Sequence, residues 1–186
     1  MKLTFVLRNK QNALKLSTKT IESFIERIKT DTKDGAVTRR RHELNLFNHV
    51  ISYDNLHPSH QIYPSVEFER DANDNLRMRA FNGVVALTID NLQTENEIET
   101  VKQAAKILHY TLAAFVGPTG KEVIILVRIA KADGSMPVDE EEADFVCRQG
   151  WQLATTIYQG LLPKPINQQP ASARSWFRMP LDATPY

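Results

Sequence analysis

The chain has 186 residues, of which 42% are apolar and 24% are charged, with 7 glycines and 9 prolines. These proportions are ordinary for a folded globular protein, and they exclude a disordered or fibrous chain. The net charge of +1 excludes a polycation that holds nucleic acid by its overall charge. We expect one domain over residues 1–186, because a chain of this length can bury about 70% of its unfolded surface.

The charges are unevenly distributed along the chain. Residues 1–50 hold 11 Lys and Arg against 5 Asp and Glu, whereas residues 51–186 hold 12 against 17. The two balances are +6 and −5, so a nucleic-acid site must be a local groove. The basic first quarter either faces phosphate or only offsets the acidic remainder.

Cysteine content and apolar runs limit the class of protein further. Cys147 is the only cysteine, so no disulfide forms within the chain and a zinc site with several thiolate ligands is excluded. The apolar run at residues 3–7 is too short for a signal peptide. No run approaches the ~18 apolar residues of a membrane span. We expect a cytoplasmic protein with no membrane contact.

The first half of the chain predicts strands at both ends and helices between them. Residues 3–7 predict a short strand. Helical spacing predicts one helix that begins after Thr18 or Thr20 and ends near Thr30, and a second helix over residues 38–51. The pattern then predicts a loop over residues 52–64 and a hairpin of two strands, at residues 63–68 and 76–81.

The second half gives clearer signals. Residues 84–89 are a continuous apolar run, which predicts a buried central strand. A capping-box pattern at Thr94 and Glu97 begins a helix. Two strands are expected at residues 111–116 and 123–129. A long helix should follow from Asp139 to about Leu161, and a last strand at residues 175–179. The expected core face of the long helix contains Phe145, Trp151 or Leu153, Ala154 and Ile157.

From residue 84 onward, the predicted order is strand, helix, strand, strand, helix, strand. This order is typical of ferredoxin-like and RNA-recognition-like domains. It predicts an α+β fold with an antiparallel sheet and helices packed on one face. The other face would be free for a ligand or covered by a second layer. Residues 1–60 are expected to be an N-terminal elaboration of a core over residues 62–186.

Asp90 directly follows the expected central strand. A carboxylate at the end of a strand is a common place for metal ligands to gather, and Thr88 and Asn91 are its nearest companions. One carboxylate does not make a metal site, however. The alternative is that Asp90 caps the turn into the following helix.

The segment Gly117-Pro118-Thr119-Gly120-Lys121 combines two glycines with a hydroxyl and an ammonium group. Such a turn suits a phosphate, because glycine lets backbone N–H groups approach the anion closely. The spacing is not that of a P-loop, and a strand follows instead of a helix. The alternative is a plain hairpin turn with an exposed lysine.

Aromatic and basic residues also alternate in and before the predicted hairpin. They are Tyr53, Tyr63, Phe68 and Phe81, with Arg70, Arg77 and Arg79. Stacking combined with charge can bind a single strand of nucleic acid. The alternative is that these aromatic side chains belong to the core.

Two segments of the chain resemble a known family. Residues 81–92 (FNGVVALTIDNL) and residues 111–127 (TLAAFVGPTGKEVIILV), followed by the run at 130–137, resemble the N-terminal domain of VirE-type proteins of bacterial mobile elements. That domain is similar to the archaeo-eukaryotic primase-polymerase fold. The resemblance extends from about Ile62 to the end. It implies a primase-like sheet, often followed by a helicase or primase module in a longer protein.

The resemblance also implies where a catalytic site would lie. Active primases carry two acidic residues, separated by one position, on the first motif strand, and Thr88 and Asp90 occupy these places here. Thr119 matches a hydroxyl residue of the second motif, whereas Ile124 stands where a phosphate-contacting histidine is expected. Remnants of a third, acidic motif are Arg174 and Asp182.

These departures predict a degenerate primase-like domain that handles single-stranded DNA or nucleotide and is not catalytic by itself. Asp90 would be the residual motif carboxylate, and it would hold Mg²⁺ or Mn²⁺ only in a site that is still active. The expected phosphate contacts are Thr119, Gly120, Lys121, Arg128 and Arg174. Two alternatives stay open: a protein-interaction module on a primase-like scaffold, and a working metal-dependent primase or nucleotidyltransferase.

Overall fold

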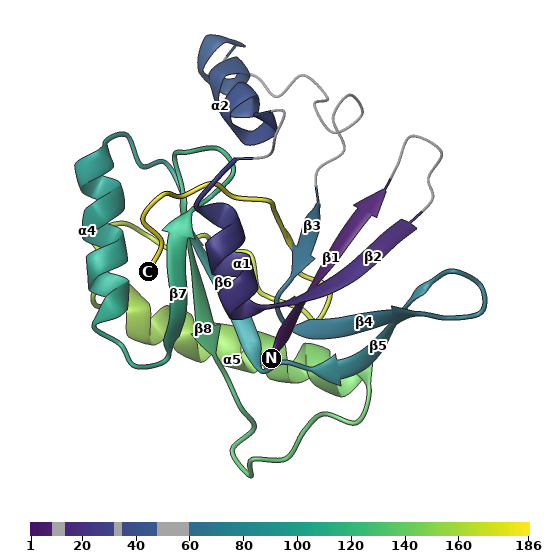
Figure 1. Ribbon diagram of the computed structural model, residues 1–186. Coiled ribbons are helices and arrows are strands. Elements are labelled where there is room, and N and C mark those ends of the chain that lie inside the picture. Colours follow the sequence, from purple (N-terminus) through teal and green to yellow (C-terminus); the bar gives the residue numbers. More distant parts are fainter. Residues whose placement is uncertain (9–13, 32–34, 48–59) are drawn as a thin grey trace.

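A computed structural model describes residues 1–8, 14–31, 35–47 and 60–186 (Figure 1). The fold is α+β, and the described residues form four helices and three antiparallel sheets. The elements are β1 (Lys2–Arg8), β2 (Leu14–Thr20), α1 (Ile21–Ile28), α2 (Ala36–Phe47), β3 (Gln61–Tyr63), β4 (Val66–Arg70), β5 (Leu76–Phe81), β6 (Val84–Ile89), α4 (Glu95–Lys106), β7 (Thr111–Val116), β8 (Val123–Arg128), α5 (Glu140–Gln159) and β9 (Phe177–Arg178). No helix within these ranges is both long and apolar enough to cross a membrane.

The central sheet has the strand order β6-β8-β7, with all neighbours antiparallel. Helix α4 connects β6 to β7, and α5 follows β8, as the predicted order requires. The last strand, β9, does not belong to the central sheet, because it pairs with β3. Asn167 lies at the free edge of β6 instead, where its backbone N–H donates to the Thr88 carbonyl at 2.8 Å.

Both faces of this central sheet are buried. Val85, Leu87 and Ile89 pack in one apolar cluster with residues of α4 and α5. Successive side chains of a strand point to opposite faces, and Val84 accordingly packs in a second cluster with residues of β1 and α1. Figure 1 shows α1 in front of the sheet and α5 behind it. The face that such sheets can leave open is therefore covered by a second layer, which contains β1, β3, β9 and α1.

Phe24 holds this second layer on the sheet. It is fully buried, and the centroid of its ring lies 5.3 Å from that of Phe115 on β7. The Phe24 ring also contacts Phe5 on β1, at 6.1 Å, and Phe177 on β9, at 6.0 Å. Helix α1 begins where expected, because the Thr20 hydroxyl accepts a hydrogen bond from the Ser23 N–H at 3.2 Å. One aromatic side chain thus joins three strands from both layers.

Several expected elements differ from the structure. The sequence reading missed β2 and β3, and residues 48–51 of the second expected helix lie outside the described residues. Of the two alternatives for the core face of α5, Trp151 is buried, and so is Ala154, as expected. The assignment of Phe145 and Ile157 to that face is wrong, since these residues are 62% and 40% exposed, and Leu153 is 64% exposed. Phe145, Leu153 and Ile157 follow a second apolar stripe, at intervals of eight and four residues, which imitates a core face. The buried face contains Ala143, Val146, Cys147, Trp151, Ala154 and Tyr158.

Replacing Phe24 with alanine should loosen the second layer. We expect the Phe24→Ala variant to lose about 3–5 kcal/mol of unfolding free energy, because a large buried ring is removed and a cavity stays behind. The matched control is Phe145→Ala, which removes an exposed ring and should change stability by about 0.5 kcal/mol or less. Urea unfolding followed by circular dichroism measures both. Equal losses in the two variants would contradict the assigned packing.

Candidate functional site

The carboxyl end of β6 meets the C-terminal tail, which is the segment of residues 160–186 that follows α5. Asp90, partly buried, accepts a hydrogen bond on Oδ2 from the Asn167 side-chain amide at 2.7 Å. Asn167 also donates its backbone N–H to the carbonyl of Thr88. The next residue, Asn91, has a φ of 60°, which turns the chain away from the strand. Asp90 is therefore fixed to the tail at the entrance to the turn.

The segment Gly117–Glu122 forms the turn between β7 and β8, and its backbone N–H groups have acceptors within the turn. The N–H of Thr119 donates to Oε1 of Glu122 at 3.1 Å, and the N–H of Lys121 donates to the Thr119 hydroxyl at 3.2 Å. The N–H of Gly120, which has a φ of +78°, donates to the Gly117 carbonyl at 3.1 Å. The Lys121 side chain is exposed. The backbone carbonyl of Lys121 accepts from the Leu92 N–H at 2.9 Å. This contact places the turn beside the segment that follows Asp90.

Glu122 supplies a carboxylate beneath this turn. Its side chain crosses the α-carbon of Gly117 so closely that a Cβ there would lie 2.3 Å from Cγ of Glu122. Burial raises the pKa of Glu122, and the nearby charge of Asp90 acts in the same direction. The hydrogen bonds from Thr119 and the charge of Arg40 act against this shift. The turn thus already contains an acidic group of the protein itself.

Arg41 of α2 contacts the same turn. Nη2 of Arg41 donates to the Gly117 carbonyl at 2.9 Å and to the Leu181 carbonyl at 2.5 Å. Burial lowers the pKa of Arg41, whereas the charge of Asp182 raises it. Arg41 therefore joins α2, the turn and the tail, and part of the basic first quarter of the chain serves the fold.

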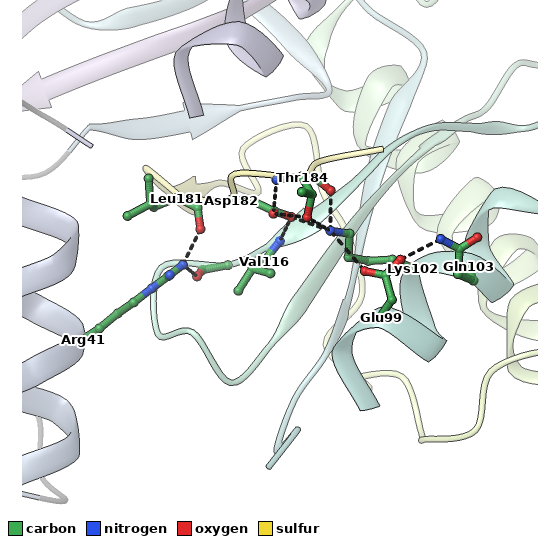
Figure 2. A network of polar contacts seen from close by, with 9 residues as sticks. Arg41, Glu99, Lys102, Gln103, Val116, Leu181, Asp182 and Thr184 are labelled. Carbon is green, nitrogen blue, oxygen red and sulfur yellow. Dashed lines mark hydrogen bonds and ion pairs between the residues drawn. The ribbon is translucent and has the colours of Figure 1, made fainter. Parts of the chain in front are cut away.

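Asp182, an expected remnant of an acidic motif, lies in a buried polar network (Figure 2). Its Oδ2 is 3.0 Å from Nζ of Lys102 on α4, and both side chains are 4% exposed. The same carboxylate accepts the backbone N–H groups of Val116 and Thr184, each at 2.9 Å. Lys102 also donates to the Thr184 carbonyl at 2.5 Å. A buried ion pair needs such additional partners to compensate its desolvation, and this one fastens the tail to α4 and β7.

The expected site residues, which are the carboxylate of Asp90 and the five phosphate contacts, do not all lie together. Asp90, Thr119, Gly120 and Lys121 gather at one end of the central sheet, as described above. Arg128 is exposed at the other end of β8, where it is paired with Val84.

Arg174, the remaining expected contact, forms an ion pair with Glu140 at the beginning of α5. Its Nη2 also donates to the Leu76 carbonyl at 3.1 Å. The guanidinium carbon of Arg174 lies 5.3 Å from the centroid of the Phe68 ring. This side chain therefore joins the tail to α5 and to the β4–β5 hairpin.

A cavity of about 460 Å³ opens beside β6, between this strand and the tail. Ala86 and Thr88 line it from β6. Both residues belong to the face of the sheet that the second layer covers, and both are only partly buried. The other described residues that line the cavity are Pro64, Trp151, Asn167, Gln169, Pro170, Ala171, Ser172, Arg174, Ser175, Trp176 and Phe177. None of the described residues that line it is acidic. Its volume is in the range of small-ligand pockets, about 300–1,000 Å³.

Comparison with known proteins places this cavity in a recognised domain. Residues 55–186 match the family described as BT4734-like, N-terminal domain. The chain belongs to this family. The matched part contains the central sheet, α4, α5 and every described residue that lines the cavity, whereas α1 precedes it. Searches of curated proteins and of solved structures found no match.

Within the BT4734-like domain, sequence reasoning missed the residues that line the cavity from the tail. Asn167, Gln169 and Trp176 stand in a proline-rich stretch without periodicity, and no motif marks them. A tryptophan in a stretch rich in proline and polar residues was the available signal. The aromatic residues proposed for stacking, Tyr63, Phe68 and Phe81, are 7%, 1% and 8% exposed and belong to the core. Tyr53 lies outside the described residues.

Within the described ranges, no three His, Cys, Asp or Glu side chains lie together in a way that could hold a metal ion. Thr88, which stands where the first of the two motif carboxylates is expected, lines the cavity.

Replacing Glu122 with glutamine should change how the stability depends on pH. The pKa of Glu122 is raised in the folded state, because its burial disfavours the ionised carboxylate. The protonated side chain therefore stabilises the fold fully when the pH is below 4.5, the ordinary pKa of a glutamate. This stabilisation is lost as the pH rises through the folded-state pKa. The Glu122→Gln side chain carries no charge at any pH and can still accept from the Thr119 N–H. We therefore expect it to raise the unfolding free energy at pH 7 and to leave it nearly unchanged at pH 4.

Urea unfolding at the two pH values measures this difference, and the exposed Glu141→Gln is the matched control. A loss of stability at pH 7 in Glu122→Gln would show that the carboxylate is required by the turn, contrary to this account.

Proposed function

We propose that the chain is a primase-like, nucleic-acid-handling domain of a mobile-element replication or mobilisation protein. It would bind single-stranded DNA or nucleotide and would not be catalytic by itself. The strand order β6-β8-β7, with α4 and α5 on one face, supports the primase-like assignment. The description of the family as an N-terminal domain supports a place in a longer protein. The VirE-like resemblance implies that a helicase or primase module would stand beside it there.

The observation that carries the proposal is the position of the cavity. It lies against β6, the strand on which the first motif of the VirE-like resemblance falls, and Thr88 lines it. Asp90 is joined to the same place through Asn167. Exposed Lys121 lies at this end of the sheet, where it could contact the backbone of a bound strand. Bases could enter the cavity while phosphates stay outside, which is how sequence-tolerant single-strand binding commonly works.

The same place supports binding more than turnover. Nucleotidyl transfer needs carboxylates that hold metal ions at the attacking and leaving oxygens. At the two expected positions, Thr88 offers a hydroxyl group and Asp90 already accepts a hydrogen bond from Asn167. Both features support a domain that has kept a binding surface on a primase-like scaffold.

A second candidate function is a protein-interaction module. Phe145, Leu153 and Ile157 on α5 expose apolar surface, and two of them line a cavity of about 610 Å³ against residues 130–133. Exposed apolar patches are typical of protein–protein contacts. This surface lies on α5, away from the cavity beside β6, so the two functions are compatible.

Binding of a fluorescein-labelled oligo-dT, measured by anisotropy, tests the proposal. We expect binding that weakens as salt rises from about 50 mM to about 200 mM, because phosphate contacts release counterions. Lys121→Ala should weaken binding and reduce the slope of log K against log salt by about 0.7, the value for one phosphate of a single strand. Arg128→Ala removes the same charge at the far end of β8 and is the matched control.

Two results would contradict the proposal. One is the absence of binding at the lower salt concentration. The other is an equal effect of Lys121→Ala and Arg128→Ala, which would indicate attraction by charge without a defined site.

A further inference from the structure

We infer that the cavity beside β6 is a nucleobase subsite and that Trp176 is its stacking surface. The inference rests on the proposed function and names the part of the ligand that enters the cavity. Trp176 lines the cavity, is 41% exposed and directly precedes β9. The other tryptophan, Trp151, is 6% exposed and packs in the core. The ring available to a ligand is therefore that of Trp176.

The charge of the lining favours an uncharged group over a phosphate. Arg174 is its only cation among the described lining residues, and Glu140 neutralises it in a close ion pair. The other polar groups are amides and hydroxyls, and the remaining residues are aromatic, proline or alanine. A phosphate would find no unpaired charge in this lining, whereas a flat heterocycle would find a ring to stack on and neutral hydrogen-bonding groups.

Polar groups at the β6 side of the cavity are held in place. The Asn167 side chain donates to Asp90, and its Oδ1 accepts the backbone N–H of Gln169 at 3.0 Å. One further N–H and one further lone pair of this amide stay available for a ligand. The hydroxyl of Thr88 can donate or accept as well. These groups offer both donors and acceptors to the edge of a base without first having to be ordered.

The stacking ring is also fixed in position. The guanidinium carbon of Arg178 lies 5.2 Å from the centroid of the Trp176 ring, in a cation–π contact. The next residue, Phe177, is 9% exposed and packs against Phe24 and Phe115 of the second layer. Trp176 therefore directly precedes a strand that packs in the second layer, and its ring is held by Arg178, so that stacking loses little conformational entropy.

Tryptophan fluorescence tests this subsite, because the chain has 2 tryptophans and only one of them lines the cavity with an exposed ring. The protein is titrated with oligo-dT, with an abasic oligomer of equal length and with the neutral disaccharide cellobiose. We expect oligo-dT to quench the emission and the other two probes to leave it unchanged. The quenching should disappear in Trp176→Phe. The comparison leaves Trp151 unchanged, so the packing of this core residue is the same in both proteins.

Affinity measured by anisotropy gives the second readout. Trp176→Leu should bind oligo-dT at least about fivefold more weakly, the lower limit for one stacked base, and Trp176→Phe should recover most of this loss. Circular dichroism and thermal unfolding confirm that both variants fold. Oligo-dT that binds without quenching, and binds Trp176→Leu as well as the wild type, would overturn the subsite and leave the proposed function standing. Quenching by cellobiose or by the abasic oligomer would also overturn it, and no binding of any oligonucleotide would overturn both.

Discussion

The burial of the three-stranded sheet on both faces is the constraint on which the rest of the structure depends. The residues of β6, β7 and β8 alternate between two apolar clusters, one beneath α4 and α5 and one beneath α1 and β1. Two buried faces explain the continuous apolar runs of these strands. Among the described residues, they leave no broad face of the sheet on which a nucleic acid could lie. A ligand can reach the sheet at the edge of β6, where the second layer ends and the cavity begins.

The C-terminal tail creates that cavity while it closes the fold. It passes the edge of β6 at Asn167, α5 at Arg174 and the second layer at β9. It then reaches the far edge of the sheet, where Tyr186 and Ala114 exchange two backbone hydrogen bonds. The buried pair of Lys102 and Asp182 holds this last stretch in place (Figure 2). The binding surface that we propose is therefore part of the stabilising structure and not an appendage.

Local signals in the sequence predicted the central part of the fold, and longer-range contacts explain where prediction failed. The apolar run of β6 and the caps at Thr94 and Asp139 are set by neighbouring residues, and both caps are present. The pairing of β9 with β3 joins residues more than 100 positions apart, which no local pattern encodes. For the site, the sequence located Asp90 and the turn at 117–122, but the partners Asn167 and Glu122 follow from the tertiary fold. Trp176 was missed for the same reason, because its role depends on where the tail passes.

Hydrogen exchange of the chain with and without oligo-dT, followed by mass spectrometry, tests the central claim most directly. The account predicts slower exchange in the tail around residues 166–178 and at the end of β6, with β7 and α1 unchanged. Slower exchange across β7 and β8, or faster exchange in α1 and β1, would contradict it, since either would mean that the second layer moves away and the ligand lies on the face of the sheet.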